Sequence, residues 1–169
     1  MTPELALRGT IWLAVIAWAS AEVLRRAGAH RREAARAVYA AGALLLAGHT
    51  AAAFQYRHAW SHAAAFAETA RRSGEVTGFA SGTGLYLNYL FVACWAVDAA
   101  WWWIAPRRYM HRTRLVDGTL FAFFLFMVVN GAVVFVTGPM RIAGAAAVVA
   151  ALAARLSARG HHTAREAEA

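Results

Sequence analysis

The chain has 169 residues, of which 60% are hydrophobic and only 15% carry a charge. A soluble domain is about 45–50% apolar and about 25% charged, so this chain is too apolar for that class. An aromatic content of 12% also excludes intrinsic disorder, because disordered chains are rich in charge and poor in aromatics. The sequence therefore predicts an all-α polytopic integral membrane helix bundle, formed as one domain by residues 1–159.

A helix that crosses the bilayer needs about 20 mainly apolar residues, and four or five segments of the chain meet this requirement. The predicted spans comprise residues 5–24, 37–56, 85–105, 115–137 and 140–156. We prefer five, because the short, alanine-rich fifth segment can span if its flanking side chains reach the interface. Gly138 and Pro139 are a turn signal, which makes the last two spans an antiparallel hairpin. Residues 160–169 form a small polar tail.

The arginines indicate the orientation of the bundle, because cytoplasmic loops of membrane proteins carry an excess of basic residues. With five spans, the three most basic segments fall on the same side of the membrane. These arginines are Arg25, Arg26, Arg31, Arg32 and Arg36 after the first span, Arg107, Arg108, Arg112 and Arg114 after the third, and Arg155, Arg159 and Arg165 after the fifth. The N-terminus is then outside and the C-terminus cytoplasmic.

Residues 8–21 also resemble a secretory signal peptide that ends in small residues. Cleavage there would leave the first arginine cluster outside, against the charge rule, so we interpret the segment as a mature helix. The net charge of +8 would suggest nucleic acid in a soluble protein, but here the basic residues flank apolar segments. The predicted partners are the lipid bilayer and other membrane subunits or copies of the chain, with no nucleic acid.

The longest loop has two halves of different character. Residues 57–72 contain no glycine or proline and predict an extension of the second helix outside the membrane. The second half holds four glycines, whose spacing matches neither a dinucleotide fingerprint nor a phosphate loop. Trp101, Trp102 and Trp103, which precede a basic segment, are expected at the cytoplasmic headgroup level.

His58 and His62 are four residues apart, the spacing at which one helix face offers two imidazoles to a metal ion. A transition metal here would need a third ligand, and Glu68 fits only if the helix bends. The alternative is that both histidines are polar residues at the outer interface. His49 points to nearly the opposite face, so it does not join this pair. It remains a candidate axial ligand for a tetrapyrrole, with Gly48 leaving room for a flat ring.

Polar residues within the spans are costly, so they are expected to face the bundle interior and find partners. Their depths predict an outer layer of His49, Tyr56, Asn88 and Asn130 and an inner layer of Glu22, Arg25 and Asp98. The inner layer is interpreted as a structural ion pair, with a proton or ion path as the alternative. The asparagines are interpreted as interhelical hydrogen-bonding groups.

Several chemistries find no support in the sequence. Cys94 is the single cysteine, which excludes an internal disulfide, and the absence of lysine excludes Schiff-base catalysis. No catalytic residue is assigned, and the sequence favours a protein that is not an enzyme. The preferred function is a non-catalytic accessory or structural subunit of a larger energy-transducing or transport complex. The alternatives are a redox protein or enzyme with a histidine site at the extracytoplasmic face, and a small oligomeric ion or proton conductor.

The lysine-free, alanine- and arginine-rich composition suggests a GC-rich coding sequence. The predicted location is therefore a bacterial inner membrane.

Overall fold

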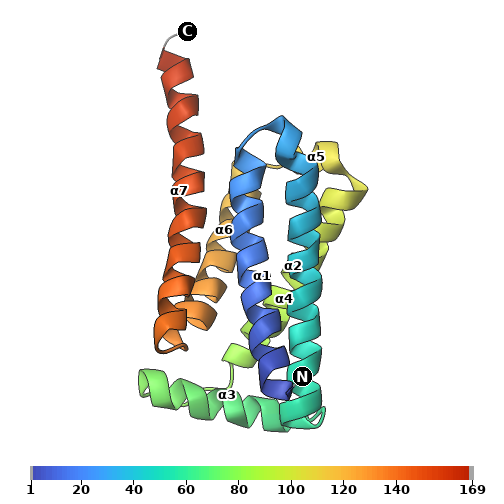
Figure 1. The fold of residues 1–169 in the computed structure, drawn as a ribbon, viewed down its shortest axis with the longest axis vertical. Helices are drawn as coiled ribbons and strands as arrows, with labels where there is room; N and C mark the ends of the chain where they lie inside the picture. Colours follow the sequence, from blue (N-terminus) through green and yellow to red (C-terminus); the bar gives the residue numbers. More distant parts are fainter. Residues whose placement is uncertain (1, 168–169) are drawn as a thin grey trace.

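The structure is a computed structural model that describes residues 2–167, and within this range the chain folds into helices without strands (Figure 1). The α-helices are α1 (Pro3–Arg26), α2 (Arg32–Ala53), α3 (His62–Thr77), α4 (Gly84–Ile104), α5 (Pro106–Met110), α6 (Arg114–Val129) and α7 (Pro139–Ala167). A 3-10 turn, η1 (Ala29–Arg31), precedes α2, and the π-helical segments η2 (Phe54–His58) and η3 (Asn130–Val134) extend α2 and α6.

The long helices α1, α2, α4, α6 and α7 lie along one axis, while α3 lies across one end of the bundle (Figure 1). Among the described residues, four helical segments are long and apolar enough to cross a membrane: Pro3–Arg26, Ala29–His58, Arg114–Val134 and Pro139–Ser157. The predicted all-helical architecture with membrane-compatible helices is therefore confirmed. Below, the end near α3 is called the α3 end, and the end near α5 is called the α5 end.

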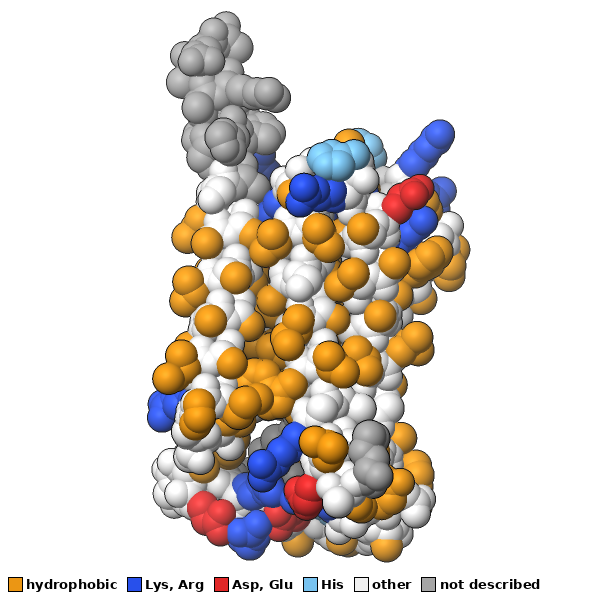
Figure 2. Space-filling model, in the orientation of Figure 1, with side chains coloured by type: hydrophobic (Ala, Val, Ile, Leu, Met, Phe, Trp, Pro, Cys, Tyr) orange, Lys and Arg blue, Asp and Glu red, His pale blue; other side chains and the backbone are white. Residues whose placement is uncertain are grey.

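The surface agrees with a membrane location. Figure 2 shows hydrophobic side chains spread over the middle of the visible face, whereas arginines, acidic residues and histidines gather at its two ends. Large hydrophobic side chains such as Leu44, Ile104 and Ile142 are each more than 70% exposed. Such side chains are stable in contact with lipid tails, so the apolar middle of the bundle is compatible with the hydrocarbon core.

The core is aromatic and sits where α2, α4 and α6 meet. Four buried residues of α4 are spaced three or four positions apart and so form one seam along the helix: Phe91, Trp95, Asp98 and Trp102. Trp95 lies on this seam, and its indole NH donates to the carbonyl of Tyr39 at 3.2 Å. A Cβ at Gly42 would lie 2.6 Å from the Trp95 ring, so only glycine allows this approach. Among the three predicted interfacial tryptophans, Trp102 is buried and stacks on Tyr109 at 4.7 Å, so it belongs to this core.

The predicted continuous extension of the second helix through residues 57–72 is wrong. The wider turns of η2 end at Ala59 and Trp60, which both adopt left-handed backbone conformations with φ of 46° and 59°. The hydroxyl of Ser61 then accepts from the backbone NH of Ala64 and begins a new helix, α3. The break changes the chain direction, and α3 therefore crosses the end of the bundle.

Because Ala59 is exposed and left-handed, Ala59→Gly is expected to raise the free energy of unfolding by about 1 kcal/mol. Glycine adopts this conformation without the Cβ clash that alanine suffers. Thermal unfolding in detergent measures the change. The matched control is Ala67→Gly in the interior of α3, where glycine should lower stability by about 0.5–1 kcal/mol. Equal destabilisation by both variants would show that the turn at Ala59 is not strained.

The predicted hairpin of the last two spans is confirmed, because η3 and α7 pack against each other antiparallel (Figure 1). Gly144 is the closest point of this contact, since a Cβ there would lie 2.2 Å from the carbonyl oxygen of Ala132. The helix α7 also packs along α1. It continues through residue 167, so most of the predicted polar tail extends the helix, and residues 168–169 lie outside the described range.

Candidate functional site

Asp98 is the centre of a polar cluster inside the α5 end of the bundle. Its carboxylate is 3% exposed and lies on the buried seam of α4. One oxygen accepts hydrogen bonds from the hydroxyls of Tyr39 at 2.8 Å and Tyr109 at 2.9 Å, and the other accepts from Arg112 at 2.8 Å. A buried charge is stable only when it is paired and hydrogen-bonded, and Asp98 meets both conditions.

Two further carboxylates extend this cluster to α1, α6 and α7. Asp117 accepts from Arg25 at 3.3 Å, from Arg155 at 2.7 Å and from two nitrogens of Arg112. Glu22 accepts from Arg25 at 3.1 Å and also pairs with Arg26. We call these groups the ionic cluster. Its members are Glu22, Arg25, Arg26, Tyr39, Asp98, Tyr109, Arg112, Asp117 and Arg155.

Aromatic rings pack against three of the arginines in the ionic cluster. The guanidinium groups of Arg26 and Arg155 lie 6.0 Å and 4.2 Å from the Phe121 ring, and that of Arg112 lies 4.2 Å from the Tyr109 ring. Such contacts stabilise arginines that have left bulk water. Burial raises the pKa of the Tyr109 phenol, and the negative charge of Asp98 raises it further. Tyr109 therefore stays protonated and keeps donating to Asp98.

The predicted inner layer of Glu22, Arg25 and Asp98 falls within this cluster, although Asp98 reaches the other two only through Arg112 and Asp117. The sequence interpretation missed the other six members of the cluster: Arg26, Tyr39, Tyr109, Arg112, Asp117 and Arg155. Arg112, Asp117 and Arg155 are located at predicted span ends, a position that normally indicates contact with headgroups. They are drawn into the cluster because Arg112 bridges Asp98 and Asp117, and Arg155 of α7 also reaches Asp117.

The predicted outer polar layer does not come together. The Nδ1 atom of His49 lies 3.0 Å from the carbonyl oxygen of Leu7 and 3.2 Å from the Thr10 hydroxyl. The amide of Asn130 donates to the carbonyl of Phe126 within its own helix, and Tyr56 is exposed. Asn88 is exposed on α4. These four side chains therefore serve separate local roles.

The i, i+4 geometry predicted for His58 and His62 is absent, because the break at Ala59 places them on different helices. His62 lies 3.1 Å from the hydroxyl of Tyr89, within a group of aromatic rings. His58 packs edge-on against Phe54 instead. Among the residues that the structure describes, no three histidine, cysteine or acidic side chains are close enough to hold one metal ion.

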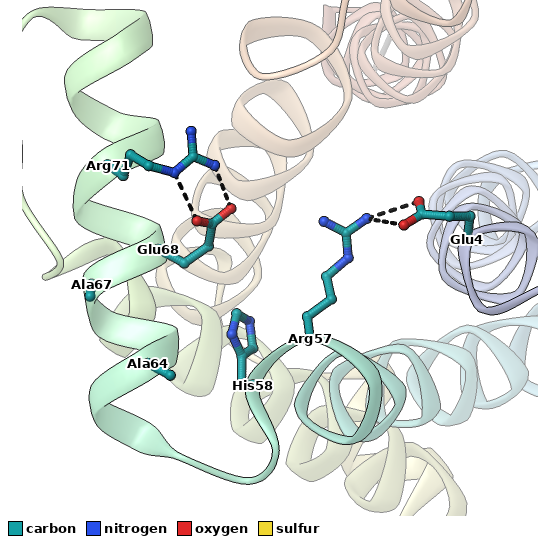
Figure 3. A pocket seen from close by; sticks show the side chains of 7 residues that line it. All are labelled: Glu4, Arg57, His58, Ala64, Ala67, Glu68 and Arg71. Carbon is teal, nitrogen blue, oxygen red and sulfur yellow. Dashed lines mark hydrogen bonds and ion pairs between the residues drawn. The ribbon is translucent and has the colours of Figure 1, made fainter.

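His58 does line a cleft of about 560 Å³ at the α3 end of the bundle. The cleft lies between the first turn of α1, η2 and α3 (Figure 3). Its remaining lining residues are Glu4, Arg57, Ala64, Ala67, Glu68 and Arg71. We call this space the outer cleft. It brings together two arginines, two carboxylates and an imidazole, and it contains Glu68, although not beside His62.

The charges of the outer cleft are arranged in pairs. Arg57 donates from its Nη2 atom to both oxygens of Glu4 at 2.9 Å. Across the cleft, Glu68 accepts from Arg71 at 2.7 and 2.9 Å and from Arg72 at 2.8 Å. Hydrogen bonds from Arg71 and then Arg72 lower the pKa of Glu68 to about 2. Glu68 is therefore a carboxylate at neutral pH.

The ionic cluster and the outer cleft are separated by apolar packing. Between them lie the side chains of Trp18, Trp95 and Phe124, each at most 2% exposed. A small cavity in the core measures about 30 Å³ and is lined by apolar residues such as Leu46, Phe91 and Met127. That volume holds at most one or two water molecules, and the walls offer them no hydrogen bonds from side chains. The two polar regions are therefore not connected through the described core.

Comparisons with protein-family models, with curated proteins and with solved structures found no match for this chain.

Proposed function

We propose that the protein is a non-catalytic subunit of a larger membrane complex, built from five spans with its N-terminus outside. The arginines support this orientation. The connections at the α5 end, residues 25–36 and 105–114, contain nine arginines, whereas those at the α3 end, residues 57–84 and 135–141, contain four. Basic residues favour the cytoplasmic side, so the α5 end is assigned to the cytoplasm, in our proposal that of a bacterium.

The fifth span in this proposal is α4. It has 21 residues, enough to cross the hydrocarbon core, and it runs beside α2 and α6. Four tryptophans and two tyrosines lower its hydropathy, but the rings of Trp95 and Trp102 are buried inside the bundle. Lipid contact is therefore made by its other face, where Leu90 and Val97 are exposed.

One observation carries the assignment of a non-catalytic role. Every carboxylate of the ionic cluster is engaged by arginines or tyrosines, so none is available as a general base or nucleophile. A conductor would need polar groups through the membrane interior, but the core described between the two ends is apolar. The arrangement supports a rigid bundle that acts through its surface.

The helix α7 supplies the surface that a partner subunit would use. Only 11% of the most apolar part of this helix is buried inside the chain, the lowest share among the four apolar segments. Its outer face carries alanines together with Ile142 and Val149, which are exposed. Small residues allow two helices in a membrane to approach closely, so this face suits a helix of another subunit.

Co-purification tests the proposal. The protein carrying an affinity tag should be extracted from native membranes in a mild detergent and crosslinked before extraction in a parallel sample. We expect one or a few defined membrane proteins to accompany it in constant ratio. A tagged unrelated membrane protein of similar size is the control for carry-over. Recovery of a solitary 18.3 kDa chain in both samples would contradict the subunit assignment.

A further inference from the structure

The outer cleft contains hydrogen-bond donors that have no acceptor among the described residues. Arg57 uses only its Nη2 atom for Glu4, which leaves the N–H groups of Nη1 and Nε without a hydrogen bond among the described residues. The ring of His58 likewise makes no hydrogen bond within the described part of the chain, and it points into the space beside Arg57 (Figure 3). Both side chains come from η2, so their relative position is fixed by one short segment.

The opposite wall is already satisfied. Arg71 donates to Glu68 and Glu75 with all three of its nitrogens, and Glu68 accepts three hydrogen bonds. The α3 wall therefore offers little to a ligand beyond the small side chains of Ala64 and Ala67, which keep the space open. Polar recognition in the outer cleft falls to Arg57 and His58, which offer an anion donors rather than acceptors.

The ion pair with Glu4 orients Arg57 but occupies only one of its three guanidinium nitrogens. A guanidinium presents five donors in a planar fork, and one nitrogen suffices for the contact with Glu4. Among the described residues, the Nη1 group remains free beside the cleft and can donate to one oxygen of a phosphate while Nη2 holds Glu4. The volume of about 560 Å³ exceeds that of a phosphate group and leaves room for the groups attached to it.

The position of the cleft adds a second constraint. It lies where the apolar segment Ala29–His58 ends and next to the start of α1, at the level where phospholipid headgroups meet the bundle. We propose that Arg57 and His58 bind the phosphate of a phosphate-bearing ligand in the outer cleft, supplied either by a phospholipid headgroup or by a soluble phosphate compound. This inference does not depend on the subunit assignment.

The test is a binding titration of the full chain in detergent after removal of bound lipid. The probes are short-chain phosphatidylglycerol and inorganic phosphate, each followed by native mass spectrometry and by calorimetry. We expect Arg57→Gln to weaken binding at least tenfold, the factor that about 1.4 kcal/mol of binding free energy represents. We expect a smaller loss for His58→Ala. Binding of phosphatidylglycerol alone assigns a lipid headgroup, whereas binding of both probes assigns the phosphate itself.

The control variant is Arg72→Gln, which removes an arginine of equal charge from α3 that pairs with Glu68 but does not line the cleft. It should bind within twofold of the parent. Each variant must elute and unfold thermally like the parent, which the exposure of the Arg57–Glu4 pair allows. The proposal is overturned if neither probe binds, if Arg57→Gln binds like the parent, or if both arginine variants weaken binding equally.

Discussion

The replacement Asp98→Asn is expected to lower the free energy of unfolding by about 3–5 kcal/mol, the cost of removing one partner from a buried ion pair. Asparagine preserves the size of the side chain but removes its charge. The ionic cluster then holds four arginines against two carboxylates instead of three. Arg112 loses one of its two acidic partners, and the hydroxyls of Tyr39 and Tyr109 face an uncharged amide. The measurement is folded yield and thermal unfolding in detergent.

Two further variants, with smaller expected losses of stability, are compared with Asp98→Asn. Tyr39→Phe removes a single hydrogen bond to the carboxylate and should cost about 1.5 kcal/mol. Glu75→Gln removes the exposed pair with Arg71 on α3 and should cost less than about 1 kcal/mol. If Asp98→Asn folds with unchanged stability, the ionic cluster is not a structural device, and the proton-path alternative would gain support. Flux measured in liposomes with the same variant then decides that alternative.

The replacement Gly144→Ala is expected to loosen α7 from the bundle and to cost about 3 kcal/mol, at the upper end of the range for overpacking. A Cβ at this position would meet the backbone carbonyl of Ala132 at 2.2 Å, and a backbone atom cannot turn aside as a side chain can. The two helices must therefore separate. The readouts are thermal unfolding and protease cleavage in the connection at residues 135–138.

The matched control for this variant is Gly48→Ala on α2. Gly48 has nothing within 4 Å of its added Cβ, so alanine adds helix propensity without a clash. Stability should stay unchanged or rise slightly. If both glycine variants behave alike, the contact between η3 and α7 is not as close as described.

The membrane-compatible helices were predictable because hydropathy is a local property of the chain. A run of about 20 apolar residues must be buried in lipid or protein whatever its neighbours are. The hairpin of α6 and α7 was equally predictable, because the pair Gly138 and Pro139 is a turn signal in the sequence. In the structure Gly138 has a φ of 73° and Pro139 begins the following helix. The break after η2 was not predictable, because alanine and tryptophan rarely adopt left-handed conformations and no glycine or proline indicates a turn there.

The polar residues also separate into features that the sequence predicted and features that it did not. Residue types and depths alone placed Glu22, Arg25 and Asp98 near one end, which agrees with the ionic cluster. Composition likewise determined that the chain is helical, apolar and most basic in the segments now found at the α5 end. Only the tertiary structure decided that Asp98 meets Tyr39 and Arg112, and that His58 faces Arg57 rather than His62. Such pairings depend on how helices rotate and where the chain turns, and those are set by packing among residues far apart in sequence.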